Sequence, residues 1–169
     1  MHSKLISTPI GPITILAEDD AIIGLYFGDT HSNKEDLSHS NKEDSFPCGG
    51  VGDSAFSFLT QCESELNSYF AGKLKQFTVP ICARGTPFRE KVWAALYRIP
   101  YCETVSYMNI AADIGNPKSV RAVGGANHHN PISIIIPCHR VIGADGALTG
   151  YGGGLDIKKW LLELEEKHK

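Results

Sequence analysis

The most informative stretch of the chain reads Ile132-Ser133-Ile134-Ile135-Ile136-Pro137-Cys138-His139-Arg140. A β-branched apolar run that ends at a proline and is soon followed by glycine predicts a buried strand closed by a turn. Such a strand would bring Cys138 and His139 to the edge of a core. Cysteine reacts as its thiolate, which a neighbouring imidazole helps to form. These residues alone leave open both a nucleophilic thiol and an inert buried cysteine.

A pair of short helices is predicted upstream of this stretch, over 107–114 and 118–126. Two helices joined by a tight turn that contains glycine have the form of a helix-turn-helix, here over 106–127. The second helix carries Lys118 and Arg121 and otherwise mostly small residues. Its backbone would therefore approach a partner closely, although such a pair is also compatible with plain scaffold.

Two longer helices frame this half of the chain. Thr86-Pro87 starts the first, with proline at a position that helices tolerate, and the helix stops before Pro100. The last helix is predicted over 155–166. Its spacing points four apolar side chains inward and the charges outward: Leu155, Trp160, Leu161 and Leu164.

The first half of the chain predicts a small antiparallel sheet with one helix. Short strands are expected at 5–7, 13–17 and 22–27, separated by turn-like residues. A helix follows over 54–70, with Asp53 or Ser54 as its N-cap, and a further strand over 77–81. Between sheet and helix the hexapeptide HSNKED occurs twice, within 31–44. So polar a segment buries little apolar surface, and we expect a mobile surface loop over 29–52.

Composition describes an ordinary globular protein of 169 residues, 42% hydrophobic and 21% charged. These values exclude wholesale disorder, and no apolar stretch approaches the roughly 20 residues of a membrane span. The N-terminus lacks the basic and apolar regions of a signal peptide, so we expect a cytoplasmic protein without a membrane partner. The five cysteines are widely spaced and suggest neither a disulfide framework nor a zinc site.

Charge is divided unevenly along the chain, which places a domain boundary near residue 84. Residues 1–83 carry 5 basic and 11 acidic side chains, whereas 84–169 carry 11 basic and 8 acidic ones. We therefore expect an N-terminal domain over 1–83 and a C-terminal domain over 84–169. The small basic excess of the second domain would help to attract a polyanion.

Taken together, the motifs of residues 84–166 resemble the O6-alkylguanine-DNA alkyltransferase family. The matching segments are Val105-Ser106-Tyr107, Gly115-Asn116-Pro117-Lys118, Arg121-Ala122-Val123-Gly124-Gly125-Ala126, Asn130-Pro131, Ile136-Pro137-Cys138-His139-Arg140-Val141 and Gly150-Tyr151-Gly152-Gly153-Gly154-Leu155. The N-terminal half matches only in general layout. The resemblance implies an α+β protein, with a small ribonuclease H-like antiparallel sheet domain and a mostly helical, winged-helix-like DNA-binding domain.

The resemblance also implies a DNA repair reaction that each molecule performs once. The family's thiolate attacks the alkyl carbon on O6 of a damaged guanine and keeps it as a thioether. Cys138 would thus accept the methyl group of O6-methylguanine in double-stranded DNA, with O4-methylthymine as a secondary substrate. His139 matches the general base, acting through a bridging water, and Glu165 matches the carboxylate that orients it. Asn130 matches a residue that holds the active-site turn.

Other matches concern DNA, because the damaged base must be rotated out of the stack. Arg121 corresponds to the arginine that takes the place of the base, and Tyr107 to the residue that crowds its phosphate. Tyr151 and Gly152 match the lip of the pocket. The family's recognition helix enters the narrow minor groove, where small residues fit: Gly124, Gly125 and Ala126. Arg140 is either a DNA contact or half of a structural ion pair.

The chain departs from the family at two points, and its residues also allow two alternative functions. No cysteine precedes Cys48, so we expect no N-terminal zinc. We also expect no other metal, no cofactor and a monomeric protein. Ser133 stands where some members have proline, which would widen the pocket. One alternative is a cysteine hydrolase that uses Cys138 and His139 over many turnovers. Another is a lesion-sensing module without catalysis, although such proteins lack the acceptor cysteine.

Overall fold

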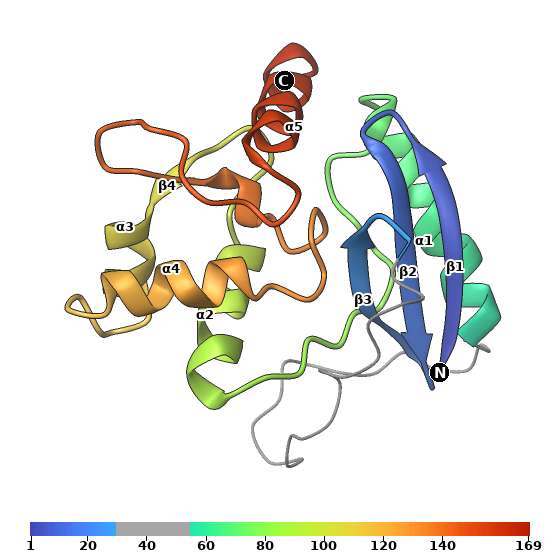
Figure 1. Ribbon diagram of the computed structural model, residues 1–169, viewed down its shortest axis with the longest axis horizontal. Coiled ribbons are helices and arrows are strands. Elements are labelled where there is room, and N and C mark those ends of the chain that lie inside the picture. Colours follow the sequence, from blue (N-terminus) through green and yellow to red (C-terminus); the bar gives the residue numbers. More distant parts are fainter. Residues whose placement is uncertain (30–54) are drawn as a thin grey trace.

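The computed structural model describes residues 1–29 and 55–169, and so the polar repeat lies outside the described residues. Its two parts stand side by side, a sheet with one helix and a larger, mostly helical part (Figure 1). The predicted α+β class is confirmed. Nothing in the described ranges forms a helix long and apolar enough to cross a membrane.

The N-terminal part is a three-stranded antiparallel meander in the order β1-β2-β3. Its strands are β1 (His2–Thr8), β2 (Gly11–Glu18) and β3 (Ala21–Phe27), followed by helix α1 (Ala55–Phe70). The helix packs against all three strands and covers one face of the sheet (Figure 1). The sheet and helix agree with the sequence prediction, whereas the predicted N-cap residues of the helix lie outside the described residues.

The strand predicted over 77–81 is not formed. Only Ile81 bridges the sheet, in parallel with Ile22. The backbone N–H groups of Thr78 and Val79 instead donate to Oε2 of Glu65, at 2.9 and 3.1 Å. Pro80 follows and has no N–H to donate. A segment whose amides are occupied by a carboxylate does not extend a strand ladder.

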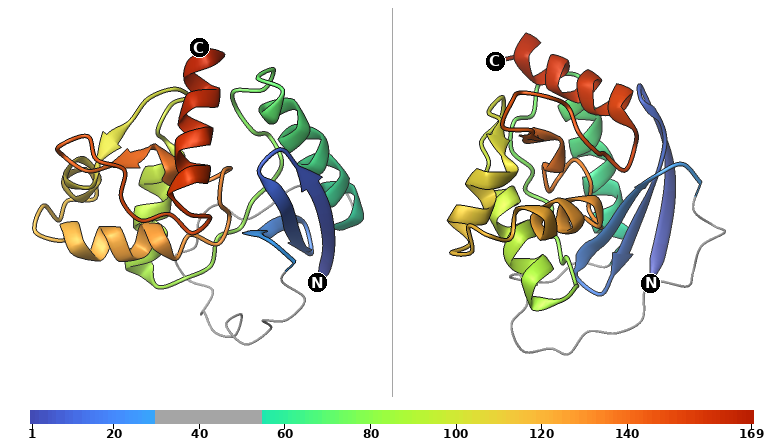
Figure 2. Two further views of the ribbon diagram at one scale, coloured as in Figure 1. Left: turned by 45° about the horizontal axis from the view of Figure 1, so that its top comes forward. Right: turned by 60° about the vertical axis from the view of Figure 1, so that its left-hand side comes forward.

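The C-terminal part is mostly helical, with one short parallel ladder of β4 against β5. Its elements are α2 (Pro87–Tyr97), β4 (Val105–Ser106), α3 (Tyr107–Asp113), α4 (Val120–His128), a 3-10 turn (Cys138–Arg140), β5 (Val141–Ile142) and α5 (Leu155–Lys167). Helices α2, α3 and α4 pack against one another. Helix α5 lies between them and the sheet in Figure 1 and in the left view of Figure 2.

Capping residues explain where α2 and α3 begin, and a turn precedes α4. The Thr86 side chain accepts from the backbone of Arg89, and Ser106 forms a capping box with Asn109. Helix α4 starts at Val120, two residues later than predicted, because the chain first turns with the Ser119 N–H donating to the Asn116 carbonyl at 3.0 Å.

The apolar run before Cys138 forms a tight turn, so the predicted strand is wrong. The Ile136 N–H donates to the Ile132 carbonyl at 3.0 Å, and Ile134 takes a positive φ of 74°. Ladder pairing is limited to isolated bridges, of Ile132 with Leu25 and of Ser133 with Ile136. The turn is nevertheless buried throughout, because it lies against the edge of β3. Burial from both domains, and not strand pairing, therefore explains the β-branched composition.

Helix α5 presents a different face from the one predicted. Leu161 and Leu164 are buried as expected, but Leu155 is 48% exposed and Lys158 is completely buried. The Lys158 ammonium donates to the carbonyls of Val141 and Thr149, at 2.5 and 2.8 Å. Two backbone acceptors replace water around this cation, which hydrophobic periodicity does not reveal.

The described ranges contain free and disulfide-bonded cysteines but no candidate metal site. Cys62, Cys102 and Cys138 carry free thiols, whereas Cys82 is disulfide-bonded, which the cysteine spacing did not predict. Within residues 1–29 and 55–169, no three His, Cys, Asp or Glu side chains gather closely enough to hold a metal ion.

Candidate active site

Cys138 opens the 3-10 turn directly after the buried turn of isoleucines. The side-chain amide of Asn130 donates to the Ile136 carbonyl at 2.8 Å and to Sγ of Cys138 at 3.1 Å. Its carbonyl oxygen accepts from the backbone of Ile132 at 3.0 Å. Asn130 thereby ties both ends of the turn together and fixes the sulfur relative to them.

The environment of Cys138 favours the neutral thiol in the free protein. Its side chain is only 2% exposed, and this burial raises the pKa of the thiol. The hydrogen bond from Asn130 and the positive charge of Lys158 act in the opposite direction. A nearby base is therefore needed to form the thiolate.

His139 is completely buried and has the geometry of such a base. Its Nε2 lies 2.8 Å from Oε1 of Glu165. Because a carboxylate only accepts, the imidazole proton sits on Nε2, and Nδ1 keeps its lone pair. Among the described residues, Nδ1 finds no hydrogen-bond partner. Burial lowers the pKa of His139 despite the carboxylate, so the ring is neutral and able to take a proton.

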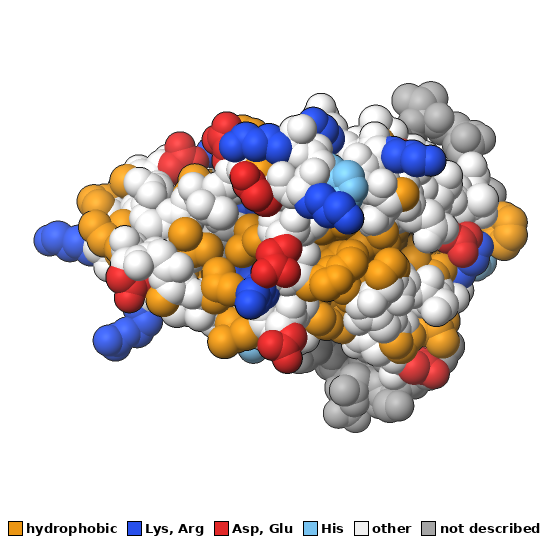
Figure 3. Space-filling view, turned by 90° about the horizontal axis from the view of Figure 1, so that it is seen from above, with side chains coloured by type: hydrophobic (Ala, Val, Ile, Leu, Met, Phe, Trp, Pro, Cys, Tyr) orange, Lys and Arg blue, Asp and Glu red, His pale blue; other side chains and the backbone are white. Residues whose placement is uncertain are grey.

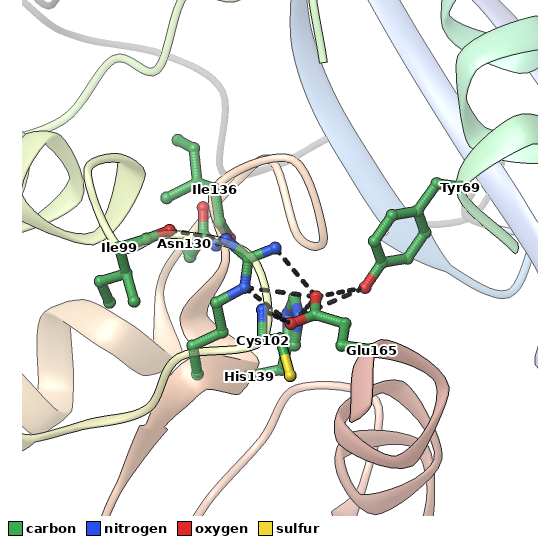
Figure 4. A network of polar contacts seen from close by, with 8 residues as sticks. Tyr69, Ile99, Cys102, Asn130, Ile136, His139 and Glu165 are labelled. Atoms are coloured by element: carbon green, nitrogen blue, oxygen red, sulfur yellow. Dashed lines mark hydrogen bonds and ion pairs between the residues drawn. The ribbon is translucent and has the colours of Figure 1, made fainter. Parts of the chain in front are cut away.

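Glu165, from α5, is the centre of the polar network drawn in Figure 4. Its oxygens accept from His139 Nε2 at 2.8 Å, Arg140 Nη2 at 2.9 Å, Tyr69 Oη at 2.7 Å and the Cys102 backbone at 3.0 Å. Burial alone would raise the pKa of this carboxyl, but hydrogen bonds and charge from His139 and Arg140 hold it well below its usual range. The carboxylate is therefore ionised throughout the neutral range.

Arg140 takes part in this network from the 3-10 turn. Its Nε and Nη2 bind Glu165, and Nη1 donates to the carbonyl of Ile99 at 2.7 Å. The side chain is 8% exposed. Of the two alternatives for Arg140, the structure thus shows the ion pair, which neutralises a buried carboxylate.

Tyr69 and Lys158 were missed by the sequence reasoning. Tyr69 sits at a helical spacing typical of core aromatics, and only the packing of α1 beside the C-terminal part shows that its hydroxyl reaches Glu165. Lys158 carries a charge on a helix whose charges were expected outside. Neither residue has a local sequence signal that would separate it from ordinary helix positions.

Most of the residues predicted to contact DNA lie on α3 and α4 and take no part in this network. Arg121 is exposed in the first turn of α4, and Gly125 follows one turn later on the same exposed face. A Cβ added at Gly125 would meet no atom, and one at Gly124 only the edge of the Tyr107 ring, at 4.0 Å. Ala126, by contrast, is buried, and its carbonyl accepts from the Trp93 indole at 2.8 Å. Ala126 therefore faces the core and is not part of the exposed face.

Figure 3 shows the face of the molecule that lies at the top of Figure 1. There, basic and acidic side chains are intermixed around a central group of hydrophobic ones. Tyr107, beside α4, accepts a hydrogen bond from the Thr149 hydroxyl at 3.1 Å. This bond connects the start of α3 with the loop that leads to α5.

That loop also carries Tyr151 and Gly152, the predicted lip of the pocket. The Tyr151 ring is buried against Phe27 of β3, with ring centroids 5.6 Å apart. Burial and the neighbouring Cys138 raise the pKa of Tyr151 well above its ordinary value. Gly152 borders open space, because a Cβ there would meet no atom. The structure thus places Tyr151 in the interior and Gly152 at the surface.

Known protein families match both halves of the chain. Residues 1–83 match the family model described as 6-O-methylguanine DNA methyltransferase, ribonuclease-like domain. Residues 87–167 match the model described as 6-O-methylguanine DNA methyltransferase, DNA binding domain. Together the two models account for nearly the whole chain.

Individual relatives agree with these models over almost their full length. The methylated-DNA–protein-cysteine methyltransferase of Methanosarcina acetivorans is 46% identical over 167 residues, covering 98% of each chain. A Bacillus subtilis relative named the constitutive methylated-DNA–protein-cysteine methyltransferase is 43% identical over 161 residues, covering 94% of this chain and 91% of the relative. The crystal structure of Mycobacterium tuberculosis OGT in complex with DNA superposes with a TM-score of 0.80 at 46% identity, covering 99% of this chain and 94% of that one. With both domains and close relatives in agreement, the chain belongs to the 6-O-methylguanine DNA methyltransferase family.

Proposed function

We propose that this protein repairs DNA by moving the methyl group of O6-methylguanine onto Cys138, once per molecule. The observation that carries the proposal is the buried His139 beside Cys138, with Nε2 anchored on Glu165 and Nδ1 unoccupied by any described residue. This arrangement is a base ready to take a proton from a neighbouring thiol. The names of the relatives, methylated-DNA–protein-cysteine methyltransferases, support the same reaction.

The transfer balances without a cofactor. A water between Cys138 and Nδ1 of His139 carries the thiol proton to the imidazole, and Glu165 stabilises the resulting imidazolium. The thiolate then attacks the methyl carbon, so that the S–C bond forms as the C–O6 bond breaks. The electron pair leaves with guanine, which takes up a proton equivalent to the one lost by the thiol. Because a thioether does not react with water, the protein is not regenerated.

Access to Cys138 requires the damaged base to leave the duplex. The thiol is buried, whereas O6 of a paired guanine lies within the base stack. We propose that α4 enters the minor groove with Gly124 and Gly125 against the backbone. Arg121 then replaces the rotated base, because a planar guanidinium both stacks and donates hydrogen bonds. Tyr107, next to Gly124, crowds the phosphate of the rotated nucleotide.

The mass of individual peptides tests this proposal. After incubation with duplex DNA that contains O6-methylguanine, we expect the Cys138 peptide to gain the mass of one methyl group. The peptide with Cys102, a more exposed free thiol, serves as an internal control and stays unmodified. Cys138→Ala should bind the same DNA without any gain in mass. Unmodified Cys138 together with unrepaired DNA, from folded protein, would refute the proposal.

Two variations of this assay, one with excess substrate and one with a different methylated base, separate the remaining alternatives. A cysteine hydrolase would process more than one equivalent of substrate and leave Cys138 free. DNA that carries O4-methylthymine tests the second substrate, for which we expect the same modification of Cys138. Sedimentation of the protein alone and bound to a short duplex tests whether it acts as a monomer.

A further inference from the structure

We propose that Tyr69, from the N-terminal domain, is a positioning residue that tunes the basicity of His139 through Glu165. Tyr69 lies in α1, whereas Cys138, His139 and Glu165 all belong to the C-terminal part. Its hydroxyl points at the carboxylate, as Figure 4 shows, and donates to Oε1 of Glu165 at 2.7 Å. The inference rests on the proposed function, in which His139 accepts the thiol proton.

Tyr69 and His139 donate hydrogen bonds to the same oxygen of Glu165. Oε1 of Glu165 accepts from Tyr69 at 2.7 Å and from Nε2 of His139 at 2.8 Å, and the two donors lie 3.4 Å apart. A hydroxyl that donates to an oxygen withdraws negative charge from it. The oxygen then stabilises a neighbouring imidazolium less well. Tyr69 thus holds the pKa of His139 lower than Glu165 alone would set it.

The hydroxyl of Tyr69 is held in place by its ring. The side chain is completely buried and packs against Phe70, Phe77 and Tyr101, with ring centroids 5.6, 5.4 and 6.2 Å away. Burial and the nearby Glu165 raise the pKa of the phenol, so that it remains a protonated donor in the neutral pH range. A phenylalanine at this position would keep the packing and lose only the hydrogen bond.

Other titratable groups face the same network, and all of them are still present in a variant in which only Tyr69 is replaced. Arg140 and Lys158 bring positive charge to His139, and both lower its pKa. Tyr101 and Tyr151 are phenols whose pKa values are raised by burial, and Cys138 is a buried thiol. A shift in the titration of His139 after Tyr69→Phe therefore reports the loss of this one hydroxyl.

The test compares Tyr69→Phe with Tyr101→Phe. The Tyr101 hydroxyl is buried in the same aromatic group but has no hydrogen-bond partner among the described residues, so the second variant is a matched control. The titration of His139 is followed by NMR of its imidazole nitrogens in the free protein. The single-turnover rate of methyl transfer is measured across the same pH range.

For Tyr69→Phe we expect the pKa of His139 to rise by about half a unit to one unit. Because only neutral imidazole accepts the thiol proton, the acidic limb of the pH–rate profile should move to higher pH by the same amount. At pH values below this limb the rate should fall ~3–10-fold, with little change on the plateau and none in DNA affinity. Tyr101→Phe should reproduce the wild-type titration and profile.

Two results would overturn the inference. One is a His139 titration in Tyr69→Phe that coincides with the wild type. The other is a uniform loss of rate at all pH values with an unmoved limb, which indicates a packing role. The NMR titration does not depend on catalysis, so a failure of the proposed function, seen as no methyl transfer at any pH, is distinguished from a failure of this inference.

Discussion

At the residue scale, the site is built around a single carboxylate. Glu165 is completely buried and accepts hydrogen bonds from side chains of both domains. Its charge is balanced by Arg140, whose Nη1 also donates to the backbone carbonyl of Ile99. Removing one member of a buried pair leaves the other charge without compensation in a region of low dielectric. The carboxylate therefore supports both the fold and the orientation of His139.

Glu165→Gln should show this double role. We expect the free energy of unfolding to fall by about 3–5 kcal/mol, because Arg140 stays buried and charged without its partner. The rate of methyl transfer should fall as well, since the imidazolium of His139 loses its stabilising charge. Denaturant unfolding and single-turnover rates measure the two effects. Glu166→Gln, at the exposed neighbouring position, is the control and should change stability by less than about 0.5 kcal/mol.

The same residues predict how stability depends on pH. The pKa values of His139 and Glu165 are both lowered by folding. The unfolded chain, with ordinary values of about 6.5 and 4.3, therefore binds more protons than the folded protein at acidic pH. Stability should be constant just above pH ~6.5, decrease below it as His139 is forced to charge, and decrease more steeply below pH ~4.3.

Equilibrium unfolding at a series of pH values checks this prediction. His139→Asn removes the first titrating group, so its stability should change less between pH ~6.5 and ~5 than that of the wild type. Equal slopes for the two proteins in this range would show that His139 is not held neutral by the fold.

At the element scale, α4 combines two unusual features for a helix. It places glycine at two adjacent interior positions, and its exposed face carries Arg121 and Gly125 one turn apart. Interior glycine destabilises a helix, so these positions are poor choices for stability alone. A flat face with a single cation suits close approach to a nucleic acid backbone.

Gly125→Ala should separate stability from binding. Alanine has the higher helix propensity and its Cβ meets no atom here, so we expect the protein to gain about 0.5–1 kcal/mol of stability. The added methyl group should weaken DNA binding, as measured by titration of a labelled duplex. Ala122→Gly, also on the exposed face, is the opposite control: it should lose stability without obstructing DNA. Unchanged affinity in Gly125→Ala would argue against the proposed docking of α4.

Arg121→Ala tests the rotation of the base. The side chain is exposed, so stability should change by less than about 0.5 kcal/mol. Transfer from duplex DNA should become slower, while transfer from the free base O6-methylguanine should keep its wild-type rate. Lys159→Ala, which removes an exposed charge from α5, controls for a general loss of attraction to DNA. Equal losses on duplex and free base would contradict the role given to Arg121.

Elements also show what the sequence predicts and what it does not. The helix beginning at Pro87 was predicted because its capping residue acts locally, and the strands of the sheet because their pattern is regular. The buried turn over 132–136 was predicted as a strand, because an apolar run reports burial and not pairing. Lys158 was expected at the surface, because the backbone carbonyls that accept from its ammonium group leave no mark in the hydrophobic periodicity.

At the scale of the whole molecule, the N-terminal domain contributes directly to the site. The Leu25 N–H of β3 donates to the Pro131 carbonyl at 2.8 Å, and Phe27 packs against Tyr151. Tyr69 reaches Glu165 from the same domain. Local motifs and the family resemblance pointed to Cys138, His139, Asn130 and Glu165. They gave no sign of Tyr69, because its contact depends on how the two domains pack.

We propose that Cys138 is an acceptor that each molecule uses once. Titration of the protein with excess duplex DNA containing O6-methylguanine, followed by peptide mass analysis, tests it most directly. We predict that transfer stops at one methyl group per protein molecule and that this group is found on Cys138. Transfer beyond one equivalent, or a methyl group on any other residue with Cys138 unmodified, would rule out this role of Cys138.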